Sequence, residues 1–157
     1  MHMESRMSQI ADAYHRATVG DAWYGPSLEE LLKKISAELA AVPPVPGSHS
    51  ILELLQHLLL WNDRVLNATD EHPMPKWQAD KEWAEPPIPW KELLAHWHKS
   101  RDLLEERIRK FPVGDLKKQV AGRDYDYEVL LRGIVEHAIY HSGQIAMVLS
   151  MLKRRAR

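Results

Sequence analysis

Two histidines stand four positions apart in a long helical pattern. His137 and His141 lie within residues 127–152, which contain no proline and repeat apolar residues at helical spacing. Residues four apart share one face of a helix, so both imidazoles should point the same way from successive turns. This is a common way for a helix to offer two nitrogen ligands to a transition metal. The same spacing also fits two core histidines that are hydrogen-bonded to neighbours. The pair alone therefore does not decide between metal binding and a role in the core.

A third histidine belongs to another predicted helix, residues 50–68. His57 lies at the edge of an apolar arc there, one turn before Trp61. Taken alone, it is typical of a half-exposed histidine, because this residue type is of intermediate burial. Together with His137 and His141 it forms a candidate metal-binding triad, provided that the two helices face each other.

Two further side chains are candidates for a substrate pocket. Trp61 is the best candidate for a pocket wall, since it follows His57 by one turn. Gln144 lies one turn beyond His141 and would hydrogen-bond a ligand or orient a histidine. The alternative for Gln144 is to pin its helix to a neighbour. Glu136 and Tyr140 should point away from the apolar face, so we assign neither as a general base.

Helices are expected to hold these residues in place. Ser27 with Glu30, and Ser50 with Glu53, form capping-box patterns that mark two helix starts. Apolar periodicity predicts a short N-terminal helix and four bundle helices, which cover residues 5–18, 27–42, 50–68, 89–111 and 127–152.

The connections between these helices predict the topology. Residues 43–49 form a short loop, so the helices on either side should be antiparallel. Residues 69–88 can cross a whole bundle, since extended chain spans about 3.3 Å per residue. The next helix can then run parallel to the one before it. We therefore predict an all-α, up-down-down-up four-helix bundle with a short extra N-terminal helix and a long connection between the second and third bundle helices.

That long connection is rich in proline and acidic residues and carries Trp77 and Trp83. Long loops in compact domains often act as lids or binding loops, and two tryptophans suit such a role. They suit a hydrophobic strap over the core equally well. The sequence leaves both interpretations open.

Length and composition restrict the class of protein. A chain of 157 residues fits a single domain, residues 1–157, around one core. The net charge of -1 gives no broad field that would favour nucleic acid or an anionic membrane. Cysteine is absent, which excludes disulfides, thiolate ligands and a cysteine nucleophile. Without a membrane-length apolar run or a signal-peptide pattern, we expect a cytoplasmic protein with no membrane or nucleic-acid partner.

Three stretches of the chain resemble a known family. They are residues 23–32, residues 49–57 with Trp61 and Asn62 beyond, and residues 133–145. On these stretches the chain resembles the DinB/YfiT-like superfamily of small bacterial four-helix proteins, which is distinct from the DNA polymerase that shares the DinB name.

The resemblance implies both a metal site and a range of activities. It implies that His57, His137 and His141 bind a divalent metal, with zinc or nickel first and iron or manganese as alternatives. Some members of the wider family resemble thiol-dependent transferases that use bacillithiol or mycothiol, and some resemble hydrolases.

Three neutral imidazoles would leave a bound metal its full positive charge and an open coordination position. Such a metal activates water or holds a small thiol as thiolate, which supplies a nucleophile to a chain without cysteine. We therefore predict a homodimeric metal-dependent enzyme that transfers a low-molecular-weight thiol to a small-molecule substrate or hydrolyses it. Two alternatives remain: a non-catalytic metal-binding or stress-associated protein, and a metal-free helical interaction module.

Overall fold

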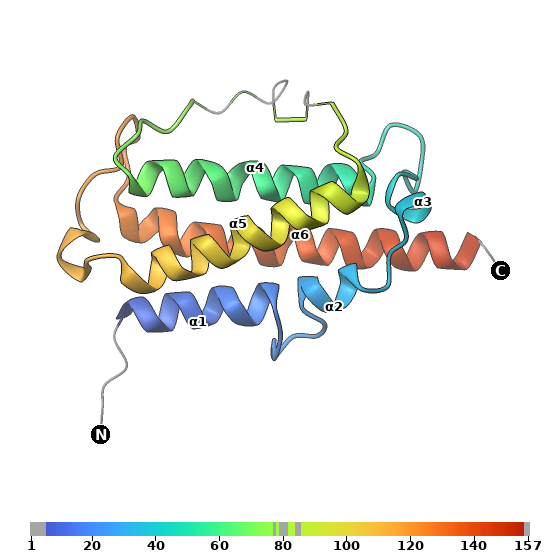
Figure 1. Cartoon of the computed structure of the whole chain (residues 1–157), viewed down its shortest axis with the longest axis horizontal. Coiled ribbons are helices and arrows are strands. Elements are labelled where there is room, and N and C mark those ends of the chain that lie inside the picture. Colours follow the sequence, from blue (N-terminus) through green and yellow to red (C-terminus); the bar gives the residue numbers. More distant parts are fainter. Residues whose placement is uncertain (1–5, 77, 79–81, 84–85, 156–157) are drawn as a thin grey trace.

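The structure is a computed structural model that describes residues 6–76, 78, 82–83 and 86–155. Within these residues the fold is all-helical and contains no strand, only an isolated bridge between Gln119 and Asp126. None of the helices formed by the described residues combines the length and the apolar character that a membrane crossing requires. In chain order the helices are α1 (Arg6–Thr18), α2 (Leu28–Leu32), α3 (Ala37–Ala40), α4 (Ile51–Thr69), α5 (Trp90–Lys110), the 3₁₀ helix η1 (Val113–Asp115) and α6 (Tyr127–Arg155) (Figure 1).

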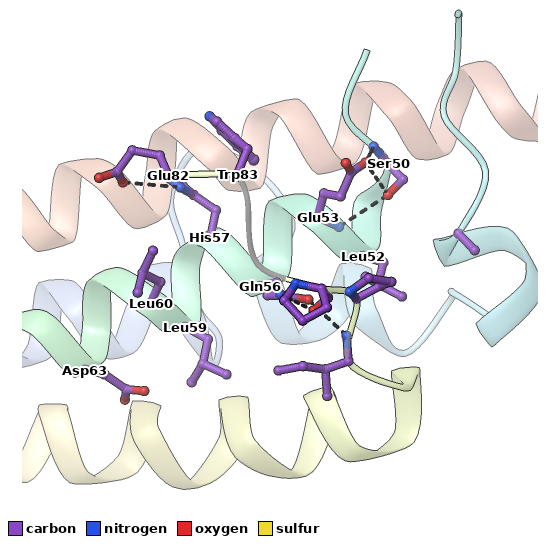
Figure 2. Close-up of a pocket in the computed structure, with 14 residues that line it drawn as sticks. Ser50, Leu52, Glu53, Gln56, His57, Leu59, Leu60, Asp63, Glu82 and Trp83 are labelled. Atoms are coloured by element: carbon purple, nitrogen blue, oxygen red, sulfur yellow. Dashed lines mark hydrogen bonds and ion pairs between the residues drawn. The ribbon is translucent and has the colours of Figure 1, made fainter. Parts of the chain in front are cut away.

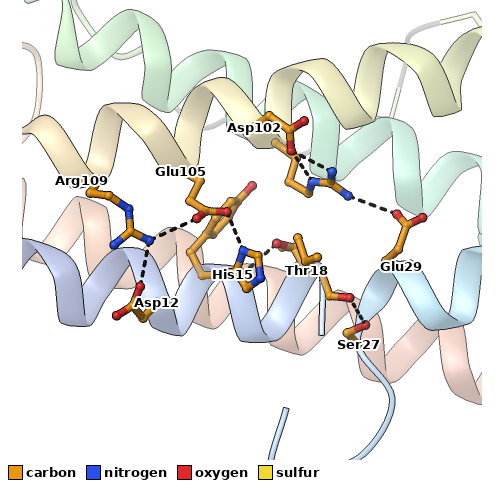
Figure 3. A network of polar contacts seen from close by, with 11 residues as sticks. Asp12, His15, Thr18, Ser27, Glu29, Asp102, Glu105 and Arg109 are labelled. Carbon is orange, nitrogen blue, oxygen red and sulfur yellow. Dashed lines mark hydrogen bonds and ion pairs between the residues drawn. The ribbon is translucent and has the colours of Figure 1, made fainter. Parts of the chain in front are cut away.

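Four long helices form the body of the molecule. Both α4 and α1 pack against α5 and α6. A polar network also joins α1 to α5 (Figure 3), in which Nδ1 of His15 lies 2.9 Å from Oε2 of Glu105, and Arg109 donates to Asp12 at 2.8 Å. The N-terminal helix, expected as a short addition, is therefore one of the four main helices.

The predicted continuous helix over residues 27–42 is wrong. The chain forms two short helices there, α2 and α3, with a turn between them. After α2, the amides of Lys34 and Ile35 bond to carbonyls three residues back, at 3.0 and 3.1 Å, so the chain leaves the α-helical path. Ser36 then adopts an extended conformation, and its side chain accepts the amide of Leu39, which starts α3.

Apolar spacing could not reveal this break. The side chains of α2 and of the turn after it do face the core, because Leu28, Leu31, Leu32 and Ile35 are all buried. A tight turn with bonds three residues apart keeps neighbouring positions on one side, much as a helix does. Only the far end of the predicted helix departs from this apolar face, where Val42 is 44% exposed.

The remaining helices follow the predicted pattern more closely. Both capping boxes form, with Ser27 and Ser50 each exchanging hydrogen bonds with the glutamate three residues later. α4 starts directly after Ser50, and α5 starts directly after Pro89. α6 starts at Tyr127 as predicted and continues beyond Leu152.

The connection between α4 and α5, residues 70–89, starts at the C-terminal end of α4 and finishes near its N-terminal end (Figure 1). Gln56 of α4 holds its final part: Nε2 donates to the carbonyl of Pro86 at 2.9 Å, and Oε1 accepts the amide of Ile88 at 3.1 Å. Trp77 lies outside the described residues. Trp83 is described and belongs to the candidate site.

The apolar core consists of two clusters that meet near the three histidines. One cluster contains Val65 and Ala68 of α4 and the buried apolar residues of α6 up to Ala138. The other takes the first part of α4 up to Leu59 and the part of α6 from Ile145 onward. Along α4 and α6, the interval between the two clusters contains the buried polar residues Asn62, His141 and Ser142.

Candidate metal centre

Two helices bring the three predicted histidines together. α6 presents His137 and His141 on successive turns, and α4 presents His57 opposite them. One nitrogen from each ring lies within 4.8 Å of the others. Nε2 of His57 is 3.1 Å from Nε2 of His137, and the centroids of the His137 and His141 rings are 4.4 Å apart. The arrangement places three nitrogen donors around one small space.

The surroundings keep these imidazoles neutral. Burial, assisted by repulsion from His141, lowers the pKa of His57 to about 4 and the pKa of His137 to about 3. Burial also lowers the pKa of His141, although its hydrogen bond to Gln144 acts in the opposite direction. Near pH 7 each ring therefore keeps an unprotonated nitrogen, which is the form that binds a metal.

A cavity of about 430 Å³ opens onto the three histidines. Trp61, the predicted pocket wall, lines it as well. The described residues that line it include no charged side chain, so it suits an uncharged and largely apolar molecule. The other lining residues are Val65, Tyr125, Val129, Leu130, Gly133, Ile134 and Tyr140.

Two neighbours on α6, Gln144 and Tyr140, contact the His141 ring. Gln144 accepts a hydrogen bond from Nδ1 of His141 at 2.6 Å, which leaves Nε2 of that ring as its unprotonated nitrogen. Gln144 is not among the described residues that line the cavity, and its geometry is that of a residue orienting a histidine. Tyr140 was expected to point away; it is 64% exposed, yet it lines the cavity and contacts the His141 ring edge-on, with centroids 5.0 Å apart.

The sequence from residue 25 to residue 145 matches the family model of the DinB superfamily. The chain belongs to the DinB superfamily. This is a metal-binding family, and the resemblance predicted from the sequence is confirmed. All three histidines fall inside the matched range. Comparison with curated proteins and with solved structures gives no match.

Glu82 is a site residue of this DinB-superfamily chain that the sequence did not reveal. It lies in the connection between α4 and α5 and is only 4% exposed. Its Oε2 accepts a hydrogen bond from Nε1 of Trp61 at 2.9 Å, and its Oε1 accepts one from Arg64 at 2.6 Å. Its Oε2 is also 3.8 Å from Nδ1 of His57 (Figure 2). In the sequence, nothing distinguishes Glu82 from the other acidic residues of that segment.

Trp83 covers one face of His57. The two rings are stacked with centroids 4.3 Å apart, and the indole also stacks on His49 with centroids 3.6 Å apart. This contact fits both predicted roles, lid and strap. Trp83 and Glu82 also line a second cavity of about 500 Å³ between α4 and the connection (Figure 2). His57 therefore borders both cavities.

The donor set fits a divalent transition metal. Neutral imidazole suits zinc, nickel and iron, and three such ligands in a shielded site with an open side are typical of catalytic zinc centres. The buried Nδ1 atoms of His57 and His137 have no hydrogen-bond partner among the described residues. If Nε2 of each ring binds a metal, the single proton of the neutral ring lies on Nδ1. For His57, the nearby acceptor for that proton is Glu82.

Proposed function

We propose that this protein is a divalent-metal-dependent enzyme whose metal is held by His57, His137 and His141. The observation that carries the proposal is the 430 Å³ cavity, which reaches all three histidines and leaves a substrate direct access to them. A purely structural site needs no such cavity. Zinc or nickel is the metal we expect first, with iron or manganese as alternatives.

The reaction we propose is transfer of a low-molecular-weight thiol to a small substrate, or hydrolysis of that substrate. When bound, the metal supplies Lewis-acid chemistry and lowers the pKa of a nucleophile beside it. A thiol must come from a cosubstrate, because the chain contains no cysteine. The apolar walls around Trp61 would bind the body of an uncharged substrate and exclude water from the reacting atoms.

The alternative function is non-catalytic metal binding. It requires protein groups to occupy the remaining coordination positions of the metal. Among the described residues, the cluster of histidine, aspartate and glutamate ligand atoms comprises the three histidines alone. This favours an open position and therefore the enzyme.

The wider expectations belong to the same proposal. We propose one domain over residues 1–157, a homodimer, and a cytoplasmic protein that acts on a small molecule and not on nucleic acid. We also propose an up-down-down-up bundle. Its first helix would be α1, which runs with α6 and opposite to α4 and α5 in Figure 1.

Metal content tests the first part of the proposal. Protein expressed without a histidine tag is compared with His57→Ala and His137→Ala by elemental analysis, with circular dichroism to verify folding. We expect about one divalent ion per parent chain and a large loss in both variants, because each removes one of three ligands. A parent that binds no stoichiometric zinc or nickel near neutral pH would refute the metal centre.

Turnover tests the second part. The loaded parent is supplied with a small thiol and uncharged electrophiles, and separately with uncharged esters and amides. Disappearance of free thiol or release of acid, present in the parent and absent in His57→Ala, supports the enzyme. A metal that is held but cannot be reached by an added small ligand such as azide or a thiol would favour the non-catalytic alternative.

A further inference from the structure

One carboxylate approaches the histidine centre from outside the two helices that carry it. Glu82 belongs to the connection between α4 and α5, and its side chain is 2% exposed. Three side chains of α4 surround it, and one of them is His57. The others are Trp61 and Arg64, which donate hydrogen bonds to Oε2 and Oε1 respectively. Glu82 therefore sits against the helix that supplies one arm of the candidate metal site.

The two nitrogens of His57 face different partners. Nε2 lies 3.1 Å from Nε2 of His137 and so points into the triad. Nδ1 is buried, has no hydrogen-bond partner within the part of the chain that the structure describes, and lies 3.8 Å from Oε2 of Glu82. A neutral imidazole carries one proton, so a ligand on Nε2 places that proton on Nδ1. The side-chain acceptor within reach of that proton is then Oε2 of Glu82, and the backbone of Glu82 faces the same ring as well.

We propose that Glu82 is the positioning residue of His57: it accepts the Nδ1 proton and holds Nε2 toward the metal. This inference rests on the proposed metal centre. A metal-ligating histidine almost always donates its other N–H to such an acceptor, which fixes both tautomer and ring orientation. An approach of about 1 Å converts the present separation into a hydrogen bond of ordinary length.

The surroundings of Glu82 suit this role. Burying a carboxylate is costly unless it is paired, and Arg64 supplies the opposite charge at 2.6 Å. Arg64 occupies Oε1, whereas Oε2 accepts from Trp61 and keeps a second lone pair on the side of His57. The next residue, Trp83, stacks on the face of the same imidazole with an interplanar angle of 11°. Adjacent residues of the connection thus restrain the ring at its edge and at its face.

Metal affinity tests the proposal. The zinc affinity of the parent and of Glu82→Gln is measured by competition with a chromogenic chelator near neutral pH. We expect the affinity to fall about 10- to 100-fold, the usual effect of losing such a partner. Glu128→Gln is the matched control: Glu128 is also buried at 7% exposure and paired with Arg132 at 3.2 Å, but it lies in the first turn of α6. Its loss should leave zinc affinity unchanged.

A spectroscopic readout separates positioning from general stability. In the zinc-loaded parent, ¹⁵N-labelled His57 should show a protonated Nδ1 whose proton resonance is shifted downfield by the carboxylate. Glu82→Gln should move that resonance upfield and speed its exchange with water. Because Glu82→Gln leaves Arg64 unpaired, the double variant Arg64→Met, Glu82→Gln provides the same measurements if the single variant does not fold.

The outcomes are distinguishable. Zinc affinity within about threefold of the parent, with an unchanged Nδ1 resonance, overturns the role of Glu82 and leaves the metal centre standing. Equal losses in Glu82→Gln and Glu128→Gln also overturn it, since the effect would then be a general loss of stability. A parent that binds no zinc overturns the metal centre and the positioning role together.

Discussion

The imidazoles of the triad lie where a positive charge is unfavourable. His57 is 8% exposed and His141 is 6% exposed, and neither ring has a carboxylate within ordinary hydrogen-bond distance. Transfer of a cation into such surroundings is costly, so the neutral forms dominate. The neutral state that makes the rings good metal ligands therefore also makes the folded protein sensitive to acid.

Acid should weaken the metal-free fold through these rings. In the unfolded chain the histidines bind protons near their ordinary pKa of about 6.5. In the folded protein the pKa is about 4 for His57 and about 3 for His137. Between these values the unfolded state binds more protons than the folded state. The contribution of these rings to the free energy of unfolding is therefore greatest above about pH 6.5 and decreases as the pH falls below it.

Urea unfolding of metal-free protein at about pH 7 and about pH 5 measures this effect, since the two values lie on either side of the ordinary histidine pKa. The double variant His57→Gln, His137→Gln serves as the control, because glutamine does not titrate. We expect its unfolding free energy to depend less on pH than that of the parent. Equal pH dependence in both proteins would contradict the lowered pKa values.

Not every residue of the site could be predicted from the sequence. His137 and His141 were predictable as a pair because helical periodicity fixes which side chains share a face. His57 became a candidate through the predicted packing of its helix against the last one, and the family resemblance then supported it, since its own helix only placed it at the edge of an apolar arc. Glu82 was not predictable, because its position follows from how an irregular connection packs and not from any repeating pattern.

At the scale of elements, α4 and α6 act as rigid carriers of the site. Each is long, and their packing fixes the distance between His57 and the pair on α6. Their bounds were predictable because apolar periodicity marks both helices, and Ser50 with Glu53 marks the start of α4. The segment from residue 27 to residue 42 was not, because Ser36 is compatible with both a helix interior and a cap.

A single substitution distinguishes these two states of Ser36. As the cap of α3, its side chain accepts the amide of Leu39 at 3.2 Å. Ser36→Ala should then lower the free energy of unfolding by about 1 kcal/mol. Inside a continuous helix the same change would be stabilising by a few tenths of a kcal/mol, since alanine has the higher helix propensity.

Chemical denaturation measures the sign of the change. Ser50→Ala is the matched control, because Ser50 caps α4 with the same extended conformation and bonds the amide of Glu53 at 3.3 Å. Both substitutions should destabilise. A stabilised Ser36→Ala beside a destabilised Ser50→Ala would argue for an uninterrupted helix over residues 27–42.

At the scale of the whole molecule, the triad lies where two apolar clusters meet. At that level the buried polar residues Asn62, His141 and Ser142 interrupt the apolar positions of α4 and α6. A metal bound by His57 of α4 and by the pair on α6 would join the two helices at this point. Metal binding should therefore stabilise the entire fold, because the unfolded chain does not hold the three ligands together.

Thermal unfolding with and without zinc tests this link. With free zinc at about 100 times the dissociation constant, binding adds about 2.7 kcal/mol to the free energy of unfolding. For a chain of this size that corresponds to a rise in Tm of about 5–10 °C. His141→Ala should remove most of the rise, because it leaves two ligands, whereas His96→Ala should keep it, because His96 is exposed on α5. A rise that persists in His141→Ala would place the stabilising metal elsewhere on the protein.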